Sequence, residues 1–219
     1  MSIKHEMQRH ALIDMARALN TAGLGTGTAG NLSVRIEGGL LITPSGVPYD
    51  RLVPEHIVKM ASDGRMGTGQ LKPSSEWRMH RDILTRRPEV SAIIHTHSPY
   101  ATALACTRRA IPAFHYMVAL AGGHTIPCAA YAPFGTQELS DAVVVTLAGR
   151  RACLMANHGM IAVGLTLEEA FGLTQEVEYL AKLYCLTLQI GGPIVLSDGE
   201  MTEALRRFES YGKQNGAIP

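Results

Sequence analysis

Three histidines in two short motifs are the residues of this 219-residue chain best suited to bind a metal. His95 and His97 are one residue apart in a stretch of β-branched and apolar residues, 90–97, which is typical of a strand. Side chains at i and i+2 of a strand leave the same face, so two imidazoles can converge on one point. His158 follows in a predicted turn between two strands, and three histidines with an open fourth position are what a catalytic zinc requires.

The identity of the metal is less well determined than the site, because imidazole also suits other borderline divalent ions. A His-x-His pair on its own is also compatible with ordinary surface or hydrogen-bonded histidines. The other six histidines have no second histidine at ligand spacing, and we expect them to be solvated or structural, or to support the ligands from behind. They are His5, His10, His56, His80, His115 and His124.

Three loops of small residues have the composition of an anion site. They contain Thr28, Gly30 and Asn31, then Ser45 and Gly46, and then Ser74 and Ser75. Glycine lets the backbone approach a ligand, successive amides can bind an anion, and the amides that begin a helix are unpaired. Together these loops could bind a phosphate without a lysine, although each one alone could be a simple turn or cap. Their spacing matches neither a Walker loop nor a dinucleotide fingerprint.

Glu76 directly follows the third loop, at the start of a predicted helix over 76–85. If the serines contact a phosphate, this carboxylate faces the same pocket. There it could remove a proton from a carbon next to a metal-polarised carbonyl. The alternative is a favourable charge at a helix N-terminus, which contributes about 0.3–1 kcal/mol. The residues alone leave both interpretations open.

The elements that position these residues alternate irregularly along the chain. Periodicity predicts helices over 5–21, 76–85, 166–190 and 201–211, a helix starting at Ser98-Pro99, and strands over 31–36, 40–42, 56–61, 90–97, 151–157 and 160–163. Without regular βαβ units, this order favours an α/β sandwich with a mixed or antiparallel sheet. Residues 110–137 contain no Lys, Arg, Asp or Glu, which indicates either a buried core segment or one that also meets a neighbouring subunit near an active site.

The overall composition argues against several classes of protein. Lys plus Arg number 20 and Asp plus Glu 19, and this balance does not favour nucleic-acid binding. We find no run of about 20 apolar residues to span a membrane, and the charged N-terminal segment does not read as a signal peptide. The four cysteines form no Cys-x-x-Cys pair, so we expect reduced thiols and a cytoplasmic protein.

Taken together, the motifs GTAGNLSVR, LITPSGVPYD, KPSSEWRMH, HTH and NHG resemble those of the class II aldolase/adducin family. The stretch IPAFHYMVALAGGHTIPCAAYAPFGTQELS and the ending FESYG are most similar to bacterial members that act on L-fuculose 1-phosphate. The resemblance extends to Tyr211. It implies a single domain over 1–219 with a three-layer α/β/α fold, a central and mainly antiparallel sheet, and a tail over 212–219 that can move. It also implies a homotetramer with active sites between subunits.

The resemblance also assigns roles to individual residues. One Zn²⁺ per subunit would be held by His95, His97 and His158, with Glu76 as an additional ligand in the empty site and as the base when substrate binds. Phosphate would lie among Gly30, Asn31, Ser45, Gly46, Ser74 and Ser75, with Thr28 close by. Tyr116 of the adjacent subunit would donate a proton to the aldehyde-derived oxygen. Phe134, Phe208 and Tyr211 would shape the aldehyde side, although aromatic packing is the alternative for these last four residues.

The activity implied is reversible cleavage of L-fuculose 1-phosphate to dihydroxyacetone phosphate and L-lactaldehyde through a metal-stabilised enediolate. Relatives with the same site leave other activities open, such as L-ribulose-5-phosphate 4-epimerisation or cleavage of another 5-deoxyketose 1-phosphate. A non-catalytic binding module like adducin is the alternative from a different class. The partners expected are thus a small phosphorylated sugar and further copies of the chain, with neither nucleic acid nor membrane.

Overall fold

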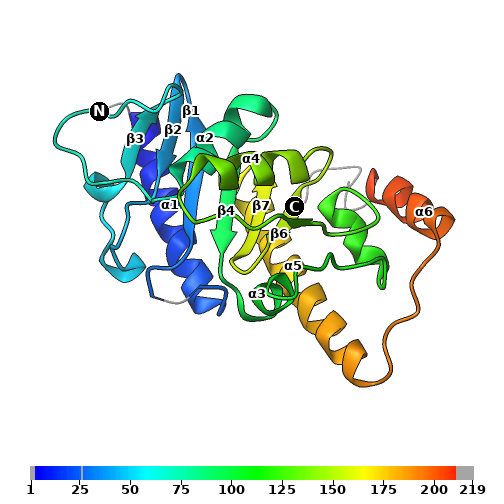
Figure 1. Cartoon of the computed structure of the whole chain (residues 1–219). Helices are drawn as coiled ribbons and strands as arrows, with labels where there is room; N and C mark the ends of the chain where they lie inside the picture. The colour runs from blue at the N-terminus through cyan, green and yellow to red at the C-terminus, as the bar shows by residue number, and fades with distance from the viewer. Residues whose placement is uncertain (1–2, 26, 211–219) are drawn as a thin grey trace, which may run out of the picture.

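The computed structural model describes residues 3–25 and 27–210 of the chain (Figure 1). Its helices and strands are α1 (Ile3–Thr21), β1 (Asn31–Ile36), β2 (Gly39–Ile42), β3 (Val58–Ala61), α2 (Trp77–Arg86), β4 (Ala92–Thr96), α3 (Pro99–Ala105), β5 (Cys128–Ala129), α4 (Gln137–Thr146), β6 (Ala152–Met155), β7 (Gly159–Gly164), α5 (Leu167–Gln189) and α6 (Asp198–Phe208). Short 3-10 helices are η1 (Tyr49–Arg51), η2 (Pro54–His56) and η3 (Tyr116–Ala121). Tyr211 and the tail over 212–219 lie outside the described residues.

The seven strands form one sheet in the order β3-β2-β1-β4-β7-β6-β5. Each neighbouring pair is antiparallel except β5 and β6, which are parallel. The expectation of a mainly antiparallel sheet is therefore confirmed. The first three strands extend from β1 to one edge of the sheet. Strand β4, which carries His95 and ends just before His97, lies at its centre.

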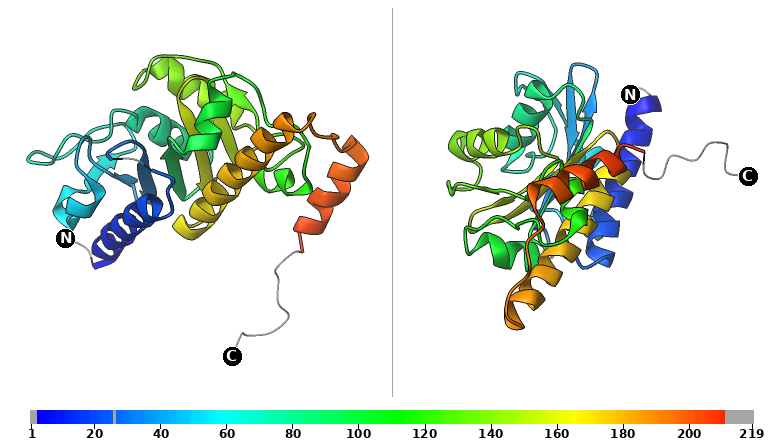
Figure 2. Two further views of the ribbon diagram at one scale, coloured as in Figure 1. Left: turned by 90° about the horizontal axis from the view of Figure 1, so that it is seen from below. Right: turned by 90° about the vertical axis from the view of Figure 1, so that its right-hand side faces the viewer.

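Helices cover both faces of this sheet, which makes three layers. The period-two pattern of β1 shows why: Leu32 and Val34 pack with α1, whereas Ser33 on the opposite face contacts α2. The views in Figure 2 place α1 and α5 on one side of the sheet and α2 and α4 on the other. The predicted α/β/α architecture is confirmed.

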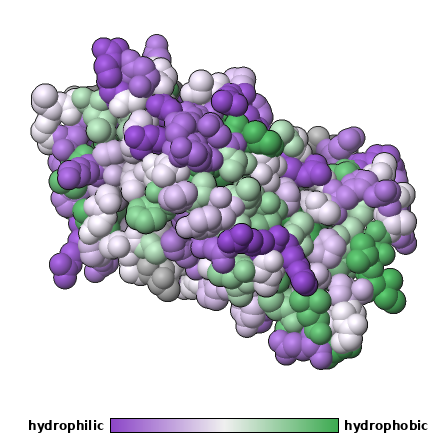
Figure 3. Space-filling model, viewed as in Figure 1, coloured by the Kyte–Doolittle hydropathy of each residue, from purple (hydrophilic) through white to green (hydrophobic). Residues whose placement is uncertain are grey.

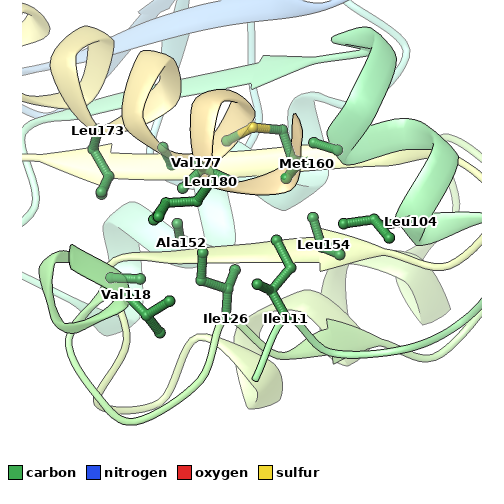
Figure 4. Packing of buried hydrophobic residues seen from close by; sticks show 14 of the residues in the cluster. Leu104, Ile111, Val118, Ile126, Ala152, Leu154, Met160, Leu173, Val177 and Leu180 are labelled. Carbon is green, nitrogen blue, oxygen red and sulfur yellow. The ribbon is translucent and has the colours of Figure 1, made fainter. Parts of the chain in front are cut away.

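Apolar contacts between α5 and the sheet form the core near β6 and β7. Leu173, Val177 and Leu180 of α5 pack with Leu154 and Met160 in a buried cluster (Figure 4). These helical residues recur at intervals of three and four, as the face of a buried helix requires. Among the described helices, we find none with the length and hydropathy of a membrane span.

Element boundaries differ from the prediction in places where capping decides them. The helix predicted over 76–85 begins at Trp77, and Glu76 rather than a serine is its N-cap residue, with no side-chain cap hydrogen bond. The last helix begins three residues before the predicted Met201, because Ser197 and Glu200 form a capping box. Sequence reasoning missed α4, although Thr136 caps it by accepting a hydrogen bond from the Leu139 amide. It also missed the short elements η3 and β5 within the uncharged segment.

Candidate active site

Sheet order brings the three predicted metal ligands together. His95 lies in β4, His97 directly follows that strand, and His158 lies in the turn between β6 and β7. Because β7 pairs with β4, the turn that carries His158 reaches the end of β4. Gly159 allows this close approach, since a Cβ there would lie 2.4 Å from the Thr96 carbonyl oxygen.

The three imidazoles converge on one point. Each pair of ring centroids is 4.9 Å apart in an edge arrangement, and the candidate ligand atoms lie within 4.8 Å of one another. His95 Nδ1 donates to the Met160 carbonyl oxygen at 2.8 Å, which turns Nε2 toward the cluster. His97 Nε2 lies 3.1 Å from His95 Nε2.

Glu76 adds a carboxylate to the same cluster. Its Oε2 lies 3.0 Å from His95 Nε2, and its Oε1 lies 3.3 Å from His158 Nε2. The side chain is only 6% exposed, and Oε1 is buried without a hydrogen-bond partner. Three imidazole nitrogens and a buried carboxylate oxygen with no donor of its own are a donor set that fits a divalent cation.

Charge within the cluster follows from burial and from these contacts. Burial acts to raise the pKa of Glu76, but His95, His158 and an Asn31 hydrogen bond lower it by more, so the carboxylate is ionised. Burial acts to lower the pKa of His95, but the Glu76 carboxylate raises it by more. Burial, together with His95 and His158, lowers the pKa of His97 to about 4. Burial and His95 also lower the pKa of His158. The His97 and His158 rings are therefore neutral near pH 7, the form in which imidazole binds a metal.

Glu76 is held by a row of buried polar side chains formed by Asn31, His80 and Ser33. Asn31 Nδ2 donates to Glu76 Oε2 at 3.1 Å, and Asn31 Oδ1 lies 2.5 Å from His80 Nε2. His80 Nδ1 lies 2.7 Å from Ser33 Oγ. Sequence reasoning expected a supporting or structural position for His80. The spacing of one helical turn between Glu76 and His80 is the signal that would have placed both on one side of α2.

The three small-residue loops line one cavity of about 450 Å³ beside the cluster. Its walls include each loop residue expected to bind phosphate, namely Thr28, Gly30, Asn31, Ser45, Gly46, Ser74 and Ser75, together with Glu76, His97 and His158. Among the described residues, none that lines it is Lys or Arg. At Gly30 the backbone has a φ of +91°, and a Cβ would lie 2.7 Å from the His95 carbonyl oxygen, so this loop packs against β4 only as glycine.

The cavity is also lined by residues that sequence reasoning largely missed. Phe134 lines the cavity, as expected, and is 73% exposed. Tyr131, Ala132 and Asn157 line it as well and were not expected. Asn157 has a φ of +54°, and its Oδ1 accepts a hydrogen bond from Arg108 Nε at 2.6 Å. Its position beside His158 was the available signal, because asparagine adopts the left-handed conformation more readily than most residues.

Two of the predicted aldehyde-side residues lie elsewhere on the chain. Tyr116 is 53% exposed and its ring stacks on that of Phe208, with centroids 6.1 Å apart. Both line a separate cavity of about 390 Å³ with Met117, Ala204 and Arg207. Neither lines the cavity beside the histidine cluster. Within one chain, therefore, these two aromatic residues are not brought to the candidate site.

The other histidines play local roles in the described structure. His115 Nδ1 accepts a hydrogen bond from the Met117 amide, His56 Nδ1 accepts one from the Val53 amide, and His124 pairs with Asp198 at 2.9 Å. None of them joins the described histidine cluster.

Comparison with known proteins agrees with this geometry. The family described as "Class II Aldolase and Adducin N-terminal domain" matches residues 10–185. A 5-methylthioribulose-1-phosphate/5-deoxyribulose-1-phosphate aldolase of Rhodospirillum rubrum is 54% identical over 211 residues, which are 96% of this chain and 95% of that protein. An L-fuculose phosphate aldolase of Escherichia coli K12 is 48% identical over 202 residues, which are 92% of this chain and 94% of that protein.

A solved structure described as "L-fuculose 1-phosphate aldolase" superposes with a TM-score of 0.89 at 41% identity, covering 95% of this chain and 98% of that one. Both the sequence and the structure of nearly the whole chain are thus shared with named aldolases. The chain belongs to the class II aldolase and adducin family, and it is an aldolase of that family.

Proposed function

We propose that this chain is a metal-dependent aldolase that reversibly cleaves a ketose 1-phosphate into dihydroxyacetone phosphate and an aldehyde. The observation that carries the proposal is the shared cavity, where the three histidines and Glu76 face loops of glycine, serine and asparagine. A metal and a base are thus available within reach of a group bound by the loops. The adducin-like alternative gives no reason for such a set of ligands.

The relatives support three substrates, which fall into two groups. The R. rubrum relative favours 5-methylthioribulose 1-phosphate or 5-deoxyribulose 1-phosphate as the first candidate. The E. coli relative and the superposed structure support L-fuculose 1-phosphate as the second. These substrates share the phosphorylated ketone end and differ in the aldehyde that leaves. The cavity wall formed by Tyr131 and Phe134 is where we place that difference.

His95, His97 and His158 would hold the metal, and we assign zinc because three imidazoles with a free position are typical of its catalytic sites. When bound, the metal would act as a Lewis acid that polarises the substrate carbonyl. In the synthetic direction Glu76 would remove a proton from the carbon beside that carbonyl, and in cleavage it would return the proton. The hydroxyls of Ser45, Ser74 and Ser75 and nearby amides would bind the phosphate.

Tyr116 is proposed to complete the site from a neighbouring copy in a homotetramer. Its half-exposed ring lies outside the cavity of its own chain, so a second subunit would have to supply the proton donor for the aldehyde oxygen. Exposed apolar residues at the end of α5 and before α6 support association, since they include Ile190 at 84% and Ile194 at 91% exposure. Figure 3 shows apolar surface gathered at this end of the molecule.

The test is a substrate panel measured with the metal-loaded protein. L-Fuculose 1-phosphate, 5-methylthioribulose 1-phosphate, 5-deoxyribulose 1-phosphate and L-ribulose 5-phosphate would each be supplied, with release of dihydroxyacetone phosphate as the readout. We expect release from at least one ketose 1-phosphate, with the highest kcat/KM for 5-methylthioribulose 1-phosphate or 5-deoxyribulose 1-phosphate. Interconversion of L-ribulose 5-phosphate without cleavage would replace the proposal by an epimerase, and inactivity on the whole panel would contradict it.

A further inference from the structure

We propose that His80, backed by Ser33, is a positioning residue that fixes the Asn31 amide and thereby makes the two oxygens of Glu76 unequal. Oε2 would stay bound to Asn31, and Oε1 would stay turned toward His158, so that the carboxylate keeps one orientation in the cluster. This inference rests on the proposed role of Glu76 as the base, and it concerns residues that do not themselves contact the reacting carbon.

Placement of the row follows from two local periodicities. Asn31 and Ser33 are two residues apart in β1, so both side chains leave the face that α2 covers. Glu76 and His80 are four residues apart across the first turn of α2, so they lie one above the other. The four side chains therefore meet in one line between the sheet and the helix.

All four side chains are closed off from solvent. Ser33 and His80 are 0% exposed, and Asn31 and Glu76 are below one tenth. A buried donor or acceptor that loses its partner costs about 1–3 kcal/mol. Water cannot replace a partner that is lost from this row, so each group depends on its neighbour for a hydrogen bond.

The direction of each hydrogen bond in the row can be deduced from the carboxylate. An ionised Glu76 only accepts, so the atom of Asn31 at 3.1 Å from Oε2 must be the donating Nδ2. Asn31 Oδ1 then faces His80 and must accept from Nε2–H at 2.5 Å. A neutral His80 has Nδ1 left as an acceptor, which Ser33 O–H satisfies at 2.7 Å. The donors run in one direction, from Ser33 to Glu76.

This direction fixes the orientation of the carboxylate. If the Asn31 amide turned over, its Oδ1 would face Glu76 Oε2, and two buried acceptors would be left without a donor. Oε1 is buried and lies 3.3 Å from His158 Nε2, and Glu76 lines the cavity. The row therefore holds the carboxylate in one orientation beside the histidines, where it would act as the base.

The test measures the proton-transfer step alone, as the rate at which deuterium from D₂O enters dihydroxyacetone phosphate when no aldehyde is present. His80→Leu removes the Nε2–H donor at similar size, whereas His80→Gln keeps a donor near the same place. We expect His80→Leu to slow exchange by about 10- to 100-fold with metal content and the KM for dihydroxyacetone phosphate little changed, and His80→Gln to recover most of the rate.

Ser33→Ala keeps the inference testable if the leucine variant does not fold, and it should slow exchange by a smaller factor. Its matched control is Thr174→Val in α5, which removes another fully buried hydroxyl that does not line the cavity and that donates to the Ala170 carbonyl oxygen. The control should exchange at the wild-type rate. Wild-type exchange in folded, metal-loaded His80→Leu and Ser33→Ala would overturn the inference, as would a loss of rate that merely parallels loss of metal.

The same measurement separates this inference from the proposed function. Exchange by the wild type but not by Glu76→Gln supports Glu76 as the base whatever the His80 variants do. If the wild-type protein catalyses no exchange, the proposed function fails and the inference fails with it. If Glu76→Gln loses exchange but the His80 and Ser33 variants exchange like the wild type, the inference is wrong and the proposed function stands.

Discussion

Asn31 and His95 are direct partners in the antiparallel ladder between β1 and β4, and their side chains meet at one oxygen of Glu76. Asn31 Nδ2 lies 3.1 Å from Oε2 and His95 Nε2 lies 3.0 Å from it. The register of two central strands thus sets the position of a carboxylate on a helix. A shift of one residue would turn either side chain to the opposite face and separate it from Glu76.

Glu76→Gln should fold normally and lose most of its turnover. The amide is close in size to the carboxylate but cannot take up a proton, and general base catalysis typically contributes about 10²- to 10⁴-fold. We expect kcat to fall by at least about 100-fold, measured by dihydroxyacetone phosphate release, with an unchanged circular dichroism spectrum. Glu138→Gln, an exposed glutamate in the first turn of α4, is the control and should keep full activity. A near-normal kcat for Glu76→Gln would remove it as the base.

His95→Ala should weaken metal binding more than a substitution of a residue that only hydrogen-bonds to a ligand. It removes one of the three imidazoles, and with it the hydrogen bond from His95 Nδ1 to the Met160 carbonyl oxygen. Substituting a residue that hydrogen-bonds to a ligand typically lowers metal affinity by about 10- to 100-fold, and substituting the ligand itself should lower it further. Competition with a chelator, followed by metal analysis, provides the measurement. His124→Ala, at an exposed ion pair with Asp198, should bind metal like the wild type; equal affinity of both variants would contradict the site.

Removing the metal should lower the thermal stability of the wild type. A ligand that binds only the folded state adds about 2.7 kcal/mol when its concentration is 100 times its Kd. The chelated protein should therefore melt at a lower Tm, and added zinc should restore it. His95→Ala supplies the comparison, because its Tm should respond weakly to chelator. An identical Tm with and without chelator in the wild type would show that these residues hold no metal.

His80 should make the stability of the fold depend on pH. Burial, with His95 as a further cause, lowers the pKa of His80 to about 3. The unfolded state therefore binds a proton below about pH 6.5 that the folded state does not, so stability falls as pH falls, down to about pH 3. Between pH 7 and 5 this one residue should account for about 2 kcal/mol.

Urea unfolding at the two pH values, at one protein and metal concentration, compares the wild type with His80→Gln. Glutamine has no proton to gain in this range, so the variant should lose less stability between pH 7 and 5 than the wild type. Using the difference between the two proteins cancels the titration of the other histidines. Equal losses would mean that His80 is not held neutral.

Tyr116→Phe should lower the rate while leaving metal content unchanged, because only the phenolic proton is removed. Mixing this variant with Glu76→Gln after partial dissociation tests whether the tyrosine acts across subunits. Where subunits exchange, some sites would combine an intact Glu76 with an intact Tyr116 of a neighbouring copy, and activity should reappear. Unchanged kinetics in Tyr116→Phe would make it a packing residue, and no recovery on mixing would place it within its own subunit's site.

Residue types and local spacing were enough to determine much of this protein. His95 and His97 at strand spacing, His158 before a glycine, Glu76 after two serines, and the three small-residue loops were all recognisable, because side-chain direction repeats every 2 or 3.6 residues. The structure brings these residues to one cavity. Local pattern also predicted the strand over 31–36 and the long helix α5.

The tertiary structure alone decided which distant segments meet. The pairing of β1 with β4 makes Asn31 a neighbour of His95, and the packing of α2 on that face places His80 behind Asn31. The same packing adds Tyr131 and Asn157 to the cavity and leaves Tyr116 outside it. Local periodicity cannot determine such contacts, because strand order and helix docking follow from burying both faces of the whole sheet at once.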